Sequence, residues 1–121
     1  MRKGNDVLET LTTWVNVQMQ EAREGLGDTE GDPDANLEGR LDALGSINRV
    51  LQDSGVTAAT VESRRVSTDA YVQYISTKSS PEEVRFAKGE IVAATGFELA
   101  LADTGYLLEM ITTPTVVKAR V

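Results

Sequence analysis

The sequence predicts an all-α protein in which two αα-hairpins form a small four-helix bundle with an extended C-terminal tail. Apolar residues recur at spacings of three and four along four segments, which is the period of an amphipathic helix. Glycine and proline separate these segments. The 121 residues suffice for one domain, which we place at residues 1–113, followed by a tail at residues 114–121.

The first helix is expected over residues 5–25, where Leu8 and Leu11 begin an apolar stripe. Gly25 and Gly27 are expected to end it, because glycine is the usual residue just past a helix C-terminus.

The second helix is expected over residues 33–54. Asp32 and Pro33 resemble a cap followed by proline in the first turn, and Leu37, Leu41 and Leu44 begin its apolar stripe. Gly55 is expected to terminate it.

The third helix, at residues 58–77, has the weakest pattern. Its first half is rich in β-branched residues, which favour strands. Its second half places Tyr71, Tyr74 and Ile75 on one side of a helix, and tyrosines one turn apart are typical of core or interface packing.

The fourth helix has the clearest start signal in the chain. Ser80, Pro81 and Glu83 together predict a capping box with proline in the first turn. The following residues are apolar on more than one face, which indicates the central helix of a bundle. Gly96 and Gly105 are expected to bend or interrupt this helix before Pro114 ends helical structure.

The two halves of the chain resemble each other at an offset of fifty residues, and Gly39 aligns with Gly89. Glycine inside a helix costs about 1 kcal/mol relative to alanine, and close approach of a neighbouring helix is one reason for it. Either one hairpin was duplicated, as residues 5–55 and 58–111, or two amphipathic helices resemble each other by chance.

The segment from Ser80 to Ala94, SPEEVRFAKGEIVAA, has a charged-Gly-charged step followed by small and apolar residues. It is similar to short helical-hairpin proteins encoded by bacteriophages, and the similarity covers about a third of the chain when both halves are counted. The resemblance implies a small virion or accessory protein and identifies no functional residue.

The composition excludes several kinds of chemistry. The chain contains no His and no Cys, which excludes disulfides, catalytic triads and ordinary zinc sites. Acidic residues alternate over residues 28–38 as in a calcium loop, but Pro33 stands where that loop requires glycine, so we expect a solvated loop. No phosphate-binding motif is present either. We therefore expect a non-enzymatic protein with no cofactor and no metal.

The net charge is −7, of which residues 1–60 carry −6. Such a charge disfavours binding to nucleic acid, because the phosphate backbone repels it. No stretch approaches the roughly 20 apolar residues needed to span a bilayer, so no membrane partner is expected. The expected location is soluble, either in the cytoplasm or in an assembled virion.

The preferred interpretation is a structural or assembly protein that acts through homo-oligomerisation, such as a phage head, connector or tail component. The alternative is an acidic inhibitor or adaptor that masks a basic surface on a host protein. The end of the fourth helix and the tail are the expected interface, the tail as an extended arm or, alternatively, a frayed terminus. The candidate interface residues are Leu99, Leu101, Leu107, Leu108, Ile111, Val116, Val117, Lys118 and Arg120.

Overall fold

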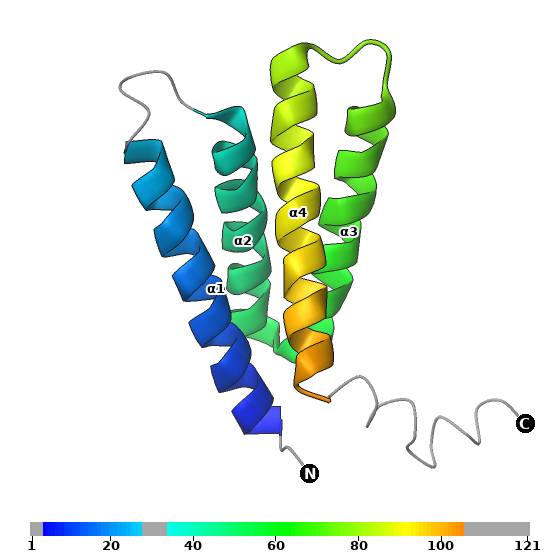
Figure 1. Cartoon of the computed structure of the whole chain (residues 1–121). Helices are drawn as coiled ribbons and strands as arrows, with labels where there is room; N and C mark the ends of the chain where they lie inside the picture. The colour runs from blue at the N-terminus through cyan, green and yellow to red at the C-terminus, as the bar shows by residue number, and fades with distance from the viewer. Residues whose placement is uncertain (1–3, 28–33, 106–121) are drawn as a thin grey trace, which may run out of the picture.

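The computed structural model describes residues 4–27 and 34–105. These residues form four helices with no strand among them, which confirms the all-α prediction (Figure 1). The helices alternate in direction, so that the first two form one antiparallel hairpin and the last two form another. They are α1 (Gly4–Gly27), α2 (Ala35–Ser54), α3 (Val56–Ile75) and α4 (Pro81–Asp103).

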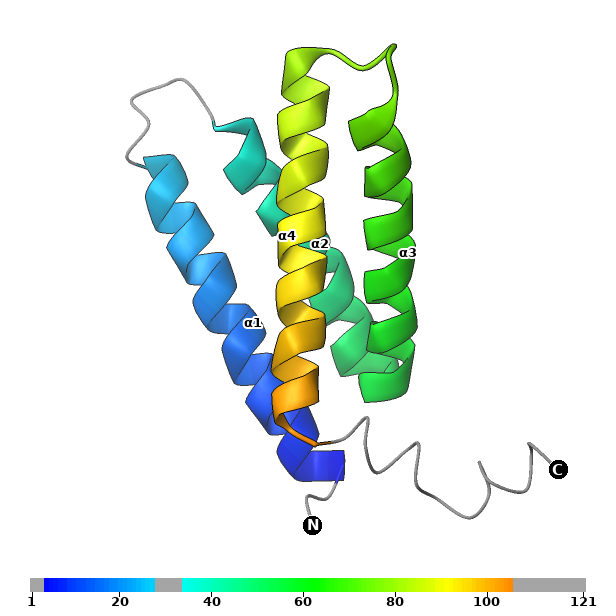
Figure 2. The same cartoon turned by 45° about the vertical axis from the view of Figure 1, so that its right-hand side comes forward.

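The centre of the bundle is the pair α2 and α4, which run side by side in the same direction. Helix α1 covers one side of this pair and α3 covers the other, as the two views in Figures 1 and 2 agree. The contact between α2 and α4 is the most extensive in the bundle. The predicted central position of the fourth helix is therefore confirmed, and α2 shares it.

The close approach of α2 and α4 explains the aligned glycines. A Cβ built on Gly39 would lie 2.0 Å from the carbonyl oxygen of Phe86, and one on Gly89 would lie 2.0 Å from that of Asn36. Phe86 is fifty residues after Asn36, the same offset that separates the two glycines. The crossing is therefore symmetric, with each helix placing its backbone against the glycine of the other.

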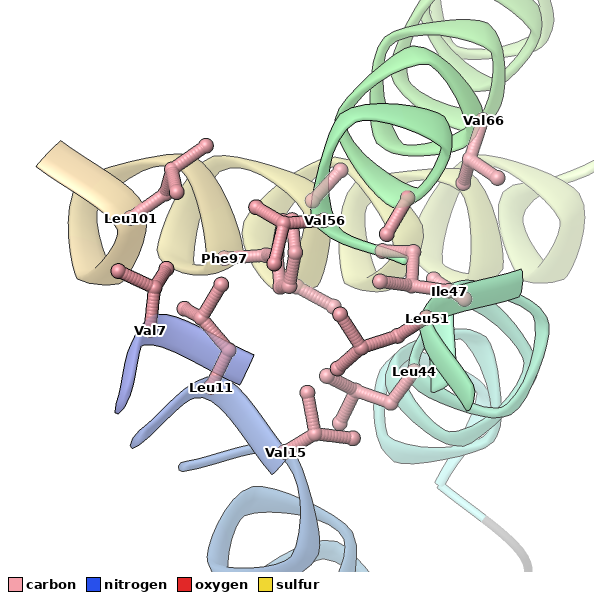
Figure 3. Close-up of a cluster of buried hydrophobic side chains, with 14 residues drawn as sticks. Val7, Leu11, Val15, Leu44, Ile47, Leu51, Val56, Val66, Phe97 and Leu101 are labelled. Atoms are coloured by element: carbon pink, nitrogen blue, oxygen red, sulfur yellow. The ribbon is translucent and has the colours of Figure 1, made fainter. Parts of the chain in front are cut away.

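The main hydrophobic core lies where the N-terminal halves of α1 and α3 meet the C-terminal halves of α2 and α4 (Figure 3). Trp14 meets Phe97 edge to face, with ring centroids 6.3 Å apart. A Cβ on Gly96 would lie 3.1 Å from the Trp14 ring. Gly96 therefore accommodates Trp14 within a continuous α4, and the prediction that it interrupts the helix is wrong.

The ends of α1 and α2 differ from the predicted ones. Helix α1 continues through Gly25, which packs against Leu37 of α2, and it ends at Gly27. Helix α2 begins at Ala35 with Asp34 as its N-cap, because the Asp34 carboxylate accepts hydrogen bonds from the first free backbone N–H groups. The predicted cap residues, 32 and 33, lie outside the described part of the chain.

Helix α4 confirms the predicted capping box. The Ser80 hydroxyl accepts a hydrogen bond from the backbone N–H of Glu83 at 3.1 Å, and the Glu83 carboxylate accepts one from the Ser80 N–H at 3.0 Å. The helix ends at Asp103, and Gly105 then adopts a positive φ of 78°, as glycines do just past a helix end. The helix ends before residue 111, where the predicted second hairpin ended, and residues 106–121 lie outside the described part.

Helix α3 begins directly after Gly55 and runs to Ile75, close to the predicted range of 58–77. Its β-branched residues do not prevent a helix because packing against α4 overrides a weak local preference. At the centre of this contact, the buried Ser63 hydroxyl donates a hydrogen bond of 3.1 Å to the carbonyl oxygen of Ala94.

Candidate functional site

The structure separates the two described residues of the predicted interface. Leu99 is exposed over 63% of its surface, whereas Leu101 is fully buried in the intramolecular core with Phe97. Leu101 lies one helical turn after Phe97, so both face the centre of the bundle. Leu101 is therefore a core residue and Leu99 a surface residue. The remaining predicted interface residues lie outside the described part of the chain: Leu107, Leu108, Ile111, Val116, Val117, Lys118 and Arg120.

Helix α3 exposes large apolar side chains on the side that faces away from the bundle. We call this surface the α3 face and define it by four residues that are each more than half exposed: Val61, Tyr71, Val72 and Ile75. Their positions fall within one stripe at 100° per residue, opposite the buried side of the helix, and the exposed Arg64 and Thr68 lie in that stripe between Val61 and the other three. The sequence had placed Tyr71 and Ile75 on one side, but Val61 and Val72 were missed.

The buried side of α3 shows why the large residues lie outside. Three of its five buried residues are small, namely Ala59, Ser63 and Ala70. The hydrogen bond from Ser63 to the α4 backbone requires close packing, and close packing leaves room only for small side chains. The usual arrangement of large apolar residues inside and small or polar ones outside is thus partly inverted in this helix.

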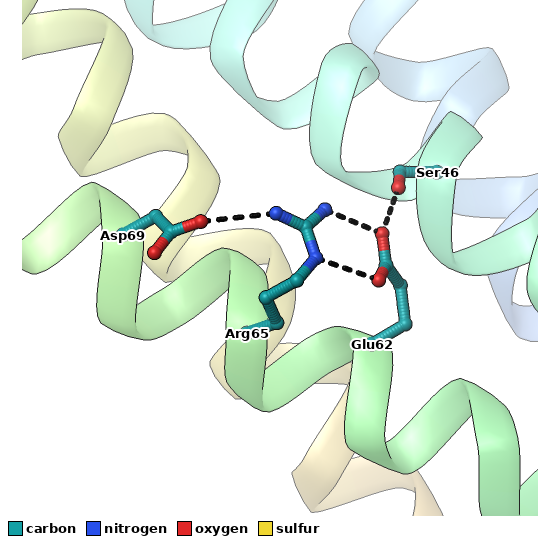
Figure 4. Close-up of polar contacts among 4 residues, drawn as sticks. All are labelled: Ser46, Glu62, Arg65 and Asp69. Carbon is teal, nitrogen blue, oxygen red and sulfur yellow. Dashed lines mark hydrogen bonds and ion pairs between the residues drawn. The ribbon is translucent and has the colours of Figure 1, made fainter.

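The charged groups of α3 are all paired. The Arg64 Nε lies 3.1 Å from Glu98 Oε1 on α4. Arg65 binds the Glu62 carboxylate through two nitrogens, at 2.6 and 2.8 Å, and Asp69 Oδ2 through a third at 3.0 Å (Figure 4). With two arginines and two carboxylates, α3 carries no net charge.

Arg65 and Asp69 line a polar groove of about 570 Å³ between α2 and α3, on the side of the molecule that also holds Glu90 of α4. Beside this groove, the Ser46 hydroxyl donates a hydrogen bond to Glu62 and so links α2 to α3 (Figure 4). The Arg65 guanidinium, bound through two nitrogens, lowers the pKa of Glu62 to about 2. Glu62 is therefore ionised at any ordinary pH.

A pair of carboxyl groups, Asp42 of α2 and Glu90 of α4, lines the same groove. Burial, followed by the hydrogen bond and charge of Asp42, raises the pKa of Glu90 to about 8. Glu90 directly follows Gly89, so it lies at the close crossing of α2 and α4. Glu90 therefore holds a proton at neutral pH, since a second ionised carboxylate beside Asp42 would be repelled by it. Sequence reasoning missed this pair, because it depends on the register between two helices.

The described carboxylates do not assemble a metal site. Within residues 4–27 and 34–105, no group of three or more His, Cys, Asp or Glu side chains is placed to hold a metal ion. In the acidic segment considered as a calcium loop, the Asp34 carboxylate caps α2 and the Asn36 side-chain oxygen accepts a hydrogen bond from Arg40 at 2.9 Å. The acidic residues at 28, 30 and 32 lie outside the described part.

None of the four described helices is both long enough and apolar enough to cross a bilayer. Comparison with known proteins found no matching family model, no matching curated protein and no matching solved structure.

Proposed function

We propose that this chain is a non-enzymatic structural or assembly protein that acts by homo-oligomerisation, with the α3 face as its main contact. One observation supports the proposal above the others. Helix α3 buries three small residues and two valines, and it exposes four large apolar side chains, each more than half accessible to solvent. Tyr71, Val72 and Ile75 lie within five residues of one another on this face, and exposed apolar patches on protein surfaces commonly mark interaction sites.

The charge distribution favours a second copy of the chain as the partner. A protein of net charge −7 repels its own copies, so self-association is least opposed where the local charge is zero. Helix α3 has no net charge, and its ion pairs already satisfy its arginines and carboxylates. By contrast, α1 carries four carboxylates and one arginine. Two copies therefore meet at the lowest electrostatic cost through their α3 helices.

The proposed assembly also uses the end of the fourth helix and the C-terminal tail, which the sequence predicts as an interface. Leu99 adds an exposed apolar side chain on α4, and residues 106–121 follow directly from the end of that helix. We propose that the tail reaches a neighbouring copy as an extended arm. A virion is the setting implied by the resemblance of residues 80–94 to small phage proteins.

The second candidate function is an acidic inhibitor or adaptor that masks a basic surface. The observation that favours it is the exposed position of all four carboxylates of α1, which are Asp6, Glu9, Glu21 and Glu24. Binding of this kind depends on charge and weakens steeply with salt. Assembly through the apolar α3 face is much less sensitive to salt.

The test compares valine-to-aspartate changes on two helices. The Val61→Asp/Val72→Asp variant puts two charges on the α3 face, where the side chains are 65% and 61% exposed. The control, Val17→Asp, puts one charge on α1, where the valine is 47% exposed. Sedimentation equilibrium should show a wild-type oligomer, an unchanged oligomer for the control and a 13.1 kDa monomer for the double variant.

The double variant should retain the helical circular dichroism of the wild type, because both changes are at the surface. If it forms the same oligomer as the wild type, the α3 face is not the interface. If the wild type is itself a monomer that binds a basic protein only at low salt, the inhibitor function replaces assembly.

A further inference from the structure

We propose that Gly55 is a hinge at which two copies of this chain exchange hairpins, giving a domain-swapped dimer. The hairpin of α1 and α2 in one copy would pack against the hairpin of α3 and α4 in the other. This inference is independent of the α3 face, because the contact that it uses is the surface buried between the two hairpins within one chain.

The connection between the hairpins is a single residue. The Gly55 N–H donates a hydrogen bond of 3.1 Å to the Leu51 carbonyl oxygen, and the Ala59 N–H donates one of 3.0 Å to the Gly55 carbonyl oxygen. Both join a residue to the fourth one before it, which is the pattern of an α-helix. Gly55 is thus bonded as a helical residue on both of its sides, although the chain reverses direction there.

Only the backbone angles of Gly55 break the helix. Its φ of 93° and ψ of −175° lie in a region that is essentially restricted to glycine. Rotation of these two angles to helical values would join α2 and α3 into one helix from Ala35 to Ile75. The hinge therefore needs no unfolding of either flanking helix.

Opening of this hinge exposes a surface that fits one partner closely. The crossing at Gly39 and Gly89 admits no side chain on either glycine, so a mismatched helix would not pack there. The hydrogen bond between Ser46 and Glu62 also joins the two hairpins. The complementary hairpin of a second copy satisfies all these contacts, and a reciprocal exchange leaves none of them open.

The substitution Gly55→Ala tests the hinge, because alanine is strained at the observed angles but favoured in a continuous helix. Each hinge should favour the open form by about tenfold, and a dimer contains two hinges. The dimerisation constant should therefore rise about a hundredfold. The matched control is Gly45→Ala, in the same helix, where a Cβ meets nothing within 4 Å.

Cross-linking distinguishes an exchanged dimer from a surface dimer. The chain has no cysteine, so Ser46→Cys/Glu62→Cys, one residue in each hairpin, introduces the only two thiols. In the Gly55→Ala background, a short bis-maleimide should give a covalent dimer on a denaturing gel. The pair Thr12→Cys/Gln52→Cys lies within one hairpin, away from the α3 face, and should give only intrachain links.

Two results would overturn the hinge. One is a Gly55→Ala protein whose mass in solution equals that of the unmodified chain at every concentration, and the other is a dimer whose links between positions 46 and 62 stay within one chain. If Gly55→Ala does not fold, the Ser46→Cys/Glu62→Cys pair is cross-linked in the protein that keeps Gly55. At high protein concentration this protein should give interchain links, and these links should disappear when two glycines are inserted after Gly55. The absence of interchain links would reject the proposal.

Discussion

Replacement of Gly89 by alanine should destabilise the protein strongly, although alanine is the better helix former. The added Cβ would lie 2.0 Å from the Asn36 carbonyl oxygen, 2.9 Å from the Asn36 carbonyl carbon and 3.1 Å from the Arg40 nitrogen. Ordinary contacts of a Cβ begin at 3.4 Å, so α2 and α4 must separate by about 1.4 Å at this point. All three atoms belong to the backbone, and no side-chain rotation can relieve the contact.

The expected cost follows from this separation. A radial gap of about 1 Å removes a quarter to a half of the dispersion energy of the contacts it opens. Forced repacking of a dense core, with the backbone shifts that it brings, costs about 1–3 kcal/mol, and a separation of this size belongs at the upper end. The intrinsic preference for alanine returns up to about 1 kcal/mol. We therefore expect the free energy of unfolding to fall by about 2 kcal/mol, and the midpoint of thermal unfolding by about 8 °C.

Urea and thermal unfolding, followed by far-ultraviolet circular dichroism, measure this effect. Gly39→Ala should behave in the same way, because its Cβ would lie 2.0 Å from the Phe86 carbonyl oxygen. The double variant should cost less than the sum of the two, since helices already separated by one Cβ admit the second. The control Gly45→Ala should stabilise the protein by about 0.5–1 kcal/mol. If Gly89→Ala is as stable as Gly45→Ala, the close crossing does not exist.

Three further predictions concern the groove, the cap and the tail. Glu90 is protonated up to about pH 8 in the folded protein but ionises near 4.5 when unfolded. Its contribution to stability is therefore complete below about pH 4.5 and is lost as the pH rises through 8, by about 2 kcal/mol after allowance for solvent in the groove. In urea titrations Glu90→Gln should flatten this dependence, and an unchanged profile would refute the assignment. Ser80→Ala should cost about 1 kcal/mol in thermal unfolding by removing the capping box, and a cost near zero would show that the cap is unimportant. Deletion of residues 114–121 should weaken assembly without loss of helical signal, and a truncated protein that assembles like the full chain would exclude the arm.

The fold could be predicted from sequence because its signals are local. Helical periodicity, the Ser80 capping box and the breaks around Gly55 are each contained within a few residues, and the structure confirms the four helices. The aligned glycines also predicted a close approach of helices, which occurs at Gly39 and Gly89. The ends of the helices were less predictable, because glycine has different roles at different positions. Gly105 follows the end of α4, whereas Gly96 lies inside α4 beside Trp14 and Gly25 lies inside α1 against Leu37.

The candidate site could not be predicted, because it depends on which sides of the helices meet. Periodicity assigns large apolar residues to the core, yet in α3 the tight contact at Ser63 admits small residues and leaves Val61 and Val72 outside. The pairing of Asp42 with Glu90 likewise depends on the register of two helices that are far apart in sequence. Neither feature has a signature within a short window of residues.

The absolute mass of the unmodified chain in solution tests the central claim most directly. Light scattering on size-exclusion fractions, over a series of concentrations and at moderate salt, gives this mass without assumptions about shape. Assembly through the α3 face predicts a mass that is a multiple of 13.1 kDa and that persists when the salt concentration is raised. A mass of 13.1 kDa at every concentration would contradict the proposal that this protein acts as an oligomer.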